Sequence, residues 1–275
     1  MASSAYRKAS RLLSDADLAF VAEASPAPLP GREKLREFLA TDEAYRRQVL
    51  GDGNVFRRVT AMDEAIVRVS PRLLFEVLLR QALGELARVG HVIERSGSDR
   101  VPVFLNDSAE AVSSPEVLGY LAEMLASFTR VSSYTTRVRV RRGTWRRVRH
   151  SDLDVGSLVQ LAHDAEAEHR MPLYKRAADA CLFIVGMFPD FPATATRYLG
   201  TGALRSRMGR LSTEEYETLG SRMYRLAADH PAAADAGLAG AMDRLSARMI
   251  EARRPLNHIA EHYLRFKRQT LFGTG

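Results

Sequence analysis

The apolar stretch at residues 177–188 constrains the fold more than any other part of this 275-residue chain. Apart from Asp179, it contains only alanine, cysteine, glycine, methionine, phenylalanine and branched aliphatic residues. A helix that is apolar nearly all round is normally buried at the centre of a protein. Pro189 and Pro192 follow the stretch, and proline interrupts the hydrogen bonds of a helix. The sequence therefore predicts a central helix over residues 173–188.

Two further helices are expected to begin at a serine followed by a proline. Ser70-Pro71 and Ser114-Pro115 each provide an N-cap hydroxyl and a ring that pre-sets the first helical φ angle. Apolar residues recur behind both pairs at spacings of three and four, which is typical of a helix with one buried face. Similar patterns predict short helices within residues 5–24 and 31–50, and longer ones over residues 153–170, 213–229, 232–252 and 255–271. Residues 100–105 have the pattern of a short extended segment, which Pro102 favours at an edge.

These elements predict an all-α fold in two parts. A small helical N-terminal region covers residues 1–64, and a multi-helix bundle covers residues 65–275. Cys181, the only cysteine, lies in the expected central helix and is interpreted as a buried structural residue. The N-terminal residues lack the apolar core of a secretory signal, and no apolar run approaches the ~20 residues of a membrane span. We therefore expect a cytoplasmic protein without a membrane span.

Basic charge is concentrated at residues 130–150. The chain has 40 basic and 33 acidic residues and a net charge of +7. Residues 130–150 hold eight arginines and no acidic residue, so 32 basic and 33 acidic residues remain elsewhere, with a net charge of −1. Codon bias in a GC-rich bacterial genome explains the preference for arginine over lysine. It does not explain the clustering, because codon bias spreads arginine along the whole chain.

Within this stretch, β-branched and basic residues alternate with the period of a strand. Residues 135–141 alternate in this way from Thr136 onward, Arg142-Gly143-Thr144 supplies turn residues, and an approximate alternation resumes at Trp145. A two-stranded ribbon is marginal in water by itself, so it must pack on the helices or become ordered on binding. The sequence therefore predicts a basic β-hairpin insertion around residues 135–150 of the helical fold.

The arginine segment is the candidate binding site. Guanidinium groups bind phosphates in a bidentate manner, and Trp145, the only tryptophan, can stack on a base. The favoured hypothesis is non-enzymatic binding of an acidic partner, with nucleic acid first, through Arg137, Arg139, Arg141, Arg142, Trp145, Arg146, Arg147 and Arg149. Another acidic protein or an anionic membrane surface is the alternative partner, and a solvated insertion without a binding role explains the same residues.

Other sequence features bear on how such a partner is recognised. A second acid-free stretch at residues 191–213 extends the basic footprint if it lies beside the first. No helix-turn-helix, zinc-finger or RNA-binding signature accompanies either stretch. This favours binding without strong sequence preference.

Two histidine clusters have spacings found in metal sites. His258, Glu261 and His262 match the H-x-x-E-H spacing of inverted zinc metalloproteases, but the 13 residues after His262 contain no acidic, histidine or cysteine ligand. Glu166 and His169 match one half of a carboxylate di-iron motif, and the sequence contains no second half. We predict no metal site and no cofactor, with His258, Glu261 and His262 as the weaker metal candidates.

Familiar catalytic motifs are absent from the sequence. Gly200-Thr201-Gly202 lacks the third glycine of a dinucleotide fingerprint, because Arg205 stands in its place. The sequence leaves an enzyme open but favours a binding protein. The second hypothesis is a helical interaction, scaffold or regulatory protein that docks a partner or a second copy of itself. The third is an enzyme or metalloprotein with an unrecognised site.

Residues 175–183 and 186–189, together with Leu256-Asn257 and residues 263–266, resemble blocks in a group of uncharacterised helical bacterial proteins of unknown function. The resemblance implies an all-helical fold and a bacterial source. It implies nothing about chemistry.

Overall fold

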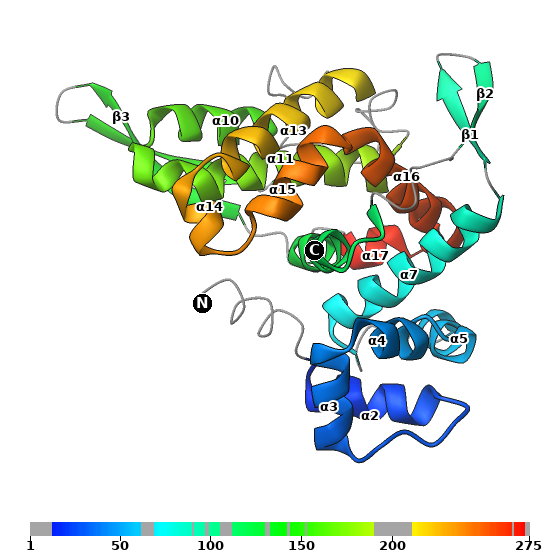
Figure 1. Ribbon diagram of the computed structural model, residues 1–275. Helices are drawn as coiled ribbons and strands as arrows, with labels where there is room; N and C mark the ends of the chain where they lie inside the picture. The colour runs from blue at the N-terminus through cyan, green and yellow to red at the C-terminus, as the bar shows by residue number, and fades with distance from the viewer. Residues whose placement is uncertain are drawn as a thin grey trace.

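A computed structural model describes residues 13–61, 69–89, 91–96, 99–104, 112–129, 133–141, 144–151, 153–189, 211–265 and 267–272. Helices make up most of this part, which confirms the all-α class (Figure 1). Two short antiparallel strand pairs accompany them. No helix within these ranges combines the length and the apolar character that crossing a membrane requires.

The predicted central helix is confirmed as α11 (Arg170–Met187). It begins three residues earlier than expected, and all of its residues from Ala177 onward are buried. It packs against α10 (Val155–Asp164), α13 (Thr213–Ala228) and α16 (Met249–His258). Gly220 of α13 allows a close approach, because a Cβ atom there would lie 2.9 Å from the Cβ of Cys181. The buried apolar surface of α11 therefore organises the bundle.

Both helices with Ser-Pro starts are present. α7 (Pro71–Val89) and α9 (Pro115–Phe128) pack against each other. The hydroxyl of Ser70 accepts a hydrogen bond from the backbone N–H of Leu73 at 3.2 Å, and that of Ser114 accepts one from Val117 at 3.4 Å. These bonds satisfy N–H groups that have no partner within the helix.

The N-terminal part contains α2 (Asp15–Ala24), α3 (Arg32–Thr41), α4 (Glu43–Leu50) and α5 (Gly53–Ala61). Ser14 is the N-cap of α2 and forms a capping box with Asp17, so a helix within the expected range 5–24 begins here. Both α4 and α5 pack on α7 (Figure 1). The boundary predicted at residue 64 falls in residues 62–68, outside the described ranges.

The C-terminal part is more divided than predicted. It contains α14 (Pro231–Asp235), α15 (Ala239–Ala247), α16, a π-helical turn η2 (Ile259–Tyr263) and α17 (Arg268–Phe272). The expected helix over 232–252 is interrupted after α14, where Gly237 has a φ angle of 68° that favours glycine. Pro255, expected to separate two helices, lies inside α16.

The strand pairs lie at different places on the helical body (Figure 1). In the first, β1 (His91–Ser96) pairs with β2 (Asp99–Phe104), so the extended segment expected at residues 100–105 has a strand partner that the sequence reading missed. In the second, β3 (Ser133–Arg141) pairs with β4 (Thr144–Ser151). The fold is therefore not purely helical.

Candidate functional site

The backbone register of β3 and β4 determines which residues share a face. Arg137 is opposite Arg147, Arg139 is opposite Trp145, and Thr135 is opposite Arg149. Opposite residues of an antiparallel pair share a face, and successive rows alternate between the two faces. The register therefore groups four arginines with the tryptophan. We call this set, Arg137, Arg139, Trp145, Arg147 and Arg149, the arginine face.

The other predicted binding residues are placed differently. Arg146 is opposite Val138, in a row that belongs to the opposite face of the strand pair. Arg141 is opposite Thr144, beyond a register shift that lies between Arg139 and Arg141. Arg142 and the stretch at 191–210 lie outside the described residues. The backbone therefore brings five of the eight predicted residues together.

The arginine face carries like charges in opposite positions. Arg137 and Arg147 face each other across the two strands, and like charges directly opposite destabilise a strand pair. Residues 130–150 contain no acidic residue to offset this repulsion locally. An anion bound between the two arginines reduces the repulsion, so the arrangement favours an anionic partner.

Several arginines of the helical body have carboxylate partners within the chain. Arg46 of α4 donates two hydrogen bonds to the Glu76 carboxylate of α7, at 2.6 and 2.5 Å, and both side chains are at most 2% exposed. Burial by itself raises the pKa of Glu76, but the hydrogen bonds and charge of Arg46, aided by Arg80 and Arg72, lower it to about 2. This buried pair holds the N-terminal helices against the bundle.

A second buried polar group centres on Asp179 of α11. The hydroxyls of Tyr120 and Tyr224 donate to its Oδ1 atom at 2.7 and 2.9 Å, and the Lys175 ammonium donates to Oδ2 at 2.6 Å. Burial raises the pKa of both tyrosines well above the ordinary value, and the charge of Asp179 adds to this effect. Since both carboxylate oxygens of Asp179 accept hydrogen bonds, we assign this polar group a structural role, in which it links α9, α11 and α13.

The predicted metal candidates His258, Glu261 and His262 do not form a cluster of three ligands. His258 Nε2 lies 2.8 Å from Glu85 Oε2 of α7, while Glu261 is exposed. The H-x-x-E-H spacing assumes an α-helix, but the chain forms a π turn in which the N–H of Leu264 donates to Ile259 at 2.9 Å. The wider turn changes the direction of Glu261 relative to His258.

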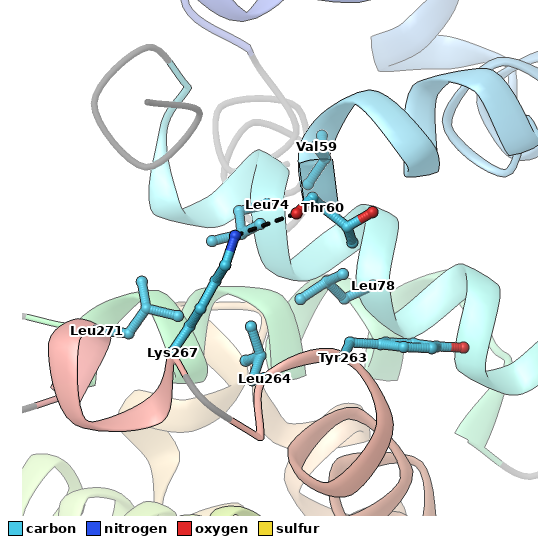
Figure 2. A pocket seen from close by; sticks show the side chains of 8 residues that line it. All are labelled: Val59, Thr60, Leu74, Leu78, Tyr263, Leu264, Lys267 and Leu271. Atoms are coloured by element: carbon cyan, nitrogen blue, oxygen red, sulfur yellow. Dashed lines mark hydrogen bonds between the residues drawn. The ribbon is translucent and has the colours of Figure 1, made fainter. Parts of the chain in front are cut away.

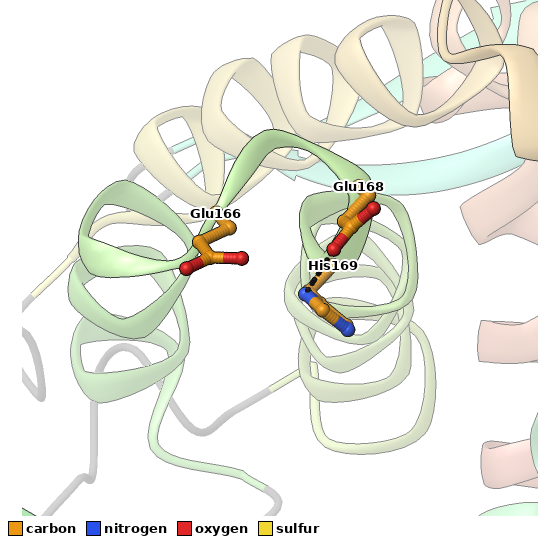
Figure 3. Close-up of side chains that lie close together, drawn as sticks. All are labelled: Glu166, Glu168 and His169. Atoms are coloured by element: carbon orange, nitrogen blue, oxygen red, sulfur yellow. Dashed lines mark ion pairs between the residues drawn. The ribbon is translucent and has the colours of Figure 1, made fainter.

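Glu166, Glu168 and His169 bring three possible ligand atoms together at the turn between α10 and α11 (Figure 3). These atoms lie within 4.8 Å of one another, and this is the one such set in the described ranges. Arg170 and His230 hold the turn by donating to the backbone oxygens of Ala165 and Ala167, at 2.9 and 2.8 Å. All three possible ligands are exposed, so water competes with a metal ion for them. Glu166 and His169, which match half of a di-iron motif, have Glu168 as the one additional possible ligand in this set.

A small apolar hollow lies between α5, α7, η2 and α17 (Figure 2). Valine and leucine side chains form most of its lining. Lys267 contributes the one charge, and its ammonium donates to the backbone oxygen of Thr60 at 3.1 Å. No carboxylate, histidine or cysteine is among the residues that line this hollow.

No family model, curated protein or solved structure matches this chain. Its function therefore has to be argued from its own residues, and the resemblance to uncharacterised helical bacterial proteins stays a prediction.

Proposed function

We propose that the protein is a non-enzymatic, cytoplasmic bacterial protein that binds nucleic acid through the arginine face. The observation that carries the proposal is the register of β3 and β4, which groups Arg137, Arg139, Arg147 and Arg149 with the sole tryptophan. The absence of acidic residues from 130–150 supports it, because the positive charge has no counter-charge nearby in the sequence.

Nucleic acid fits this arrangement better than other acidic partners. A phosphate backbone presents regularly spaced anions that guanidinium groups bind in a bidentate manner. An aromatic residue in the same row as an arginine adds a surface on which a base can stack. An acidic protein or an anionic membrane offers charge but no base, whereas nucleic acid offers Trp145 a base to stack on beside the phosphates.

Binding of this kind depends mainly on electrostatics. Each phosphate that an arginine neutralises releases counterions, so affinity falls steeply as the salt concentration rises. No helix-turn-helix, zinc-finger or RNA-binding signature accompanies the arginine face in the sequence, so sequence preference is expected to be weak.

The proposal is tested by a salt series on the full chain with labelled oligonucleotides. Replacing the four arginines of the arginine face, Arg137, Arg139, Arg147 and Arg149, together by alanine should abolish binding without changing the helical circular dichroism. A matched variant replaces four exposed arginines of the helical body, Arg32, Arg47, Arg88 and Arg222, and removes the same charge. This variant should retain most of the affinity.

Two other outcomes point elsewhere. Equal losses in the two quadruple variants would show that net charge alone drives binding, and would overturn the arginine face as the site. A salt-tolerant oligomer without nucleic-acid binding would instead favour the scaffold hypothesis.

A further inference from the structure

We infer that the nucleic acid bound by the arginine face is single-stranded, with Trp145 stacked on an exposed base. This inference rests on the proposed function and specifies its partner. It starts from the row in which Arg139 is opposite Trp145, next to the row in which Arg137 is opposite Arg147. Successive rows on one face are roughly 7 Å apart, so aromatic and cationic groups alternate over a short distance.

The presence of Trp145 beside the arginines favours single-stranded over double-stranded nucleic acid as the partner. In a duplex, the faces of the bases are already stacked on one another. An aromatic side chain reaches them only by wedging between base steps, which costs a few kcal/mol per step. A single strand exposes its base faces, and stacking on an aromatic residue is then favourable for any base.

The composition of the segment also argues against reading a duplex groove. A two-stranded ribbon can enter the major groove, where arginine reads guanine and asparagine or glutamine reads adenine. Residues 130–150 contain no asparagine and no glutamine. Arginines beside an aromatic residue match instead the combination of basic and stacking groups that holds single strands without sequence preference.

The single tryptophan provides a direct probe of the contact. Because Trp145 is the only tryptophan, the intrinsic tryptophan fluorescence of the full chain reports on this position alone. Oligo-thymidine and its duplex with oligo-adenosine of equal length are titrated into the protein. In parallel, the fluorescence anisotropy of labelled versions measures binding independently of Trp145.

We expect oligo-thymidine to bind and to quench Trp145 fluorescence, and the duplex to bind more weakly without quenching. Trp145→Ala should weaken single-strand binding about tenfold, within the range measured for loss of one stacked base. Trp145→Phe should retain most of the affinity because it keeps an aromatic face. Both variants should leave the helical circular dichroism unchanged and should weaken duplex binding less than single-strand binding.

The outcomes separate the inference from the proposed function. Equal binding of duplex and single strand, with unchanged fluorescence and no effect of Trp145→Ala, would overturn the single-strand inference and leave nucleic-acid binding standing. Absence of binding to both oligonucleotides at low salt would overturn both proposals.

Discussion

Arg46 and Arg137 show the same residue type in contrasting surroundings. The Arg46 guanidinium is buried, donates to both oxygens of Glu76, and also donates to the backbone oxygen of Leu39 at 2.6 Å. Arg137 is opposite a second arginine, in a segment without acidic residues. An arginine whose counter-charge lies in a neighbouring helix stabilises the fold. For an arginine opposite another arginine, in a segment without acidic residues, we propose a role in binding a partner.

The largest loss of stability is expected when Glu76, the acidic member of the buried Arg46–Glu76 pair, is replaced. Glu76→Gln leaves the Arg46 charge buried without its carboxylate, and removing one member of a buried ion pair typically costs 3–5 kcal/mol of unfolding free energy. Urea denaturation followed by circular dichroism measures this loss. The double variant Arg46→Met with Glu76→Leu should recover most of it, since an apolar pair can replace buried charges. A loss below 1 kcal/mol in Glu76→Gln would show that the pair does not hold the N-terminal helices.

Acid should weaken the same contact in a defined pH window. The pKa of Glu76 is lowered from 4.5 to about 2 in the folded protein, so its ionised form stabilises the fold above the unfolded pKa. That contribution of about 3 kcal/mol is lost as the pH falls from about 5 toward the folded pKa. Chemical denaturation at a series of pH values measures the loss. Glu76→Gln should show a smaller dependence on pH in this window, and an identical dependence would exclude Glu76 as the source.

Asp179 is the acidic counterpart of Arg46, because it is buried among donors from three helices. Asp179→Asn removes the charge that Lys175 faces and should lower the unfolding free energy by about 2 kcal/mol, as expected for hydrogen bonds to a charged group. Lys175→Met should cost more, because it leaves the buried Asp179 charge without a cation, whereas the partly exposed Lys175 can reach water in Asp179→Asn. Thermal unfolding of both variants checks the order, and a smaller loss in Lys175→Met would contradict it.

Local signals in the sequence predicted much of the fold but little of these networks. The apolar stretch around Cys181 predicted α11, and the serines at positions 70 and 114 predicted the starts of α7 and α9. The partner of His258 is Glu85, 173 residues away, and no local pattern indicates that their helices cross. The π turn after His258 is likewise not encoded in the spacing of charged residues, and it changes how His258, Glu261 and His262 are placed.

The candidate binding site shows the same division between local and long-range information. Alternation predicted extended backbone around Arg137 and Arg139, and only the pairing register shows that Arg147 lies opposite the first and Trp145 opposite the second. The register depends on where the turn falls between the strands. Composition and alternation do not determine that position to within one residue, and a shift by one residue exchanges the two faces.

The smallest stability change provides the sharpest test of the comparison between Arg46 and Arg137. Replacing Arg137 and Arg147 together by threonine removes a pair of like charges and adds two residues that favour strands. The unfolding free energy should therefore stay constant or rise by about 0.2–1 kcal/mol, while affinity for nucleic acid falls. Denaturation and anisotropy measured on the same preparation give both quantities. Residues whose role is to bind a partner are expected to leave the stability of the free protein unchanged or to lower it. A variant that loses stability and affinity together would therefore mean that these two arginines stabilise the fold as Arg46 does.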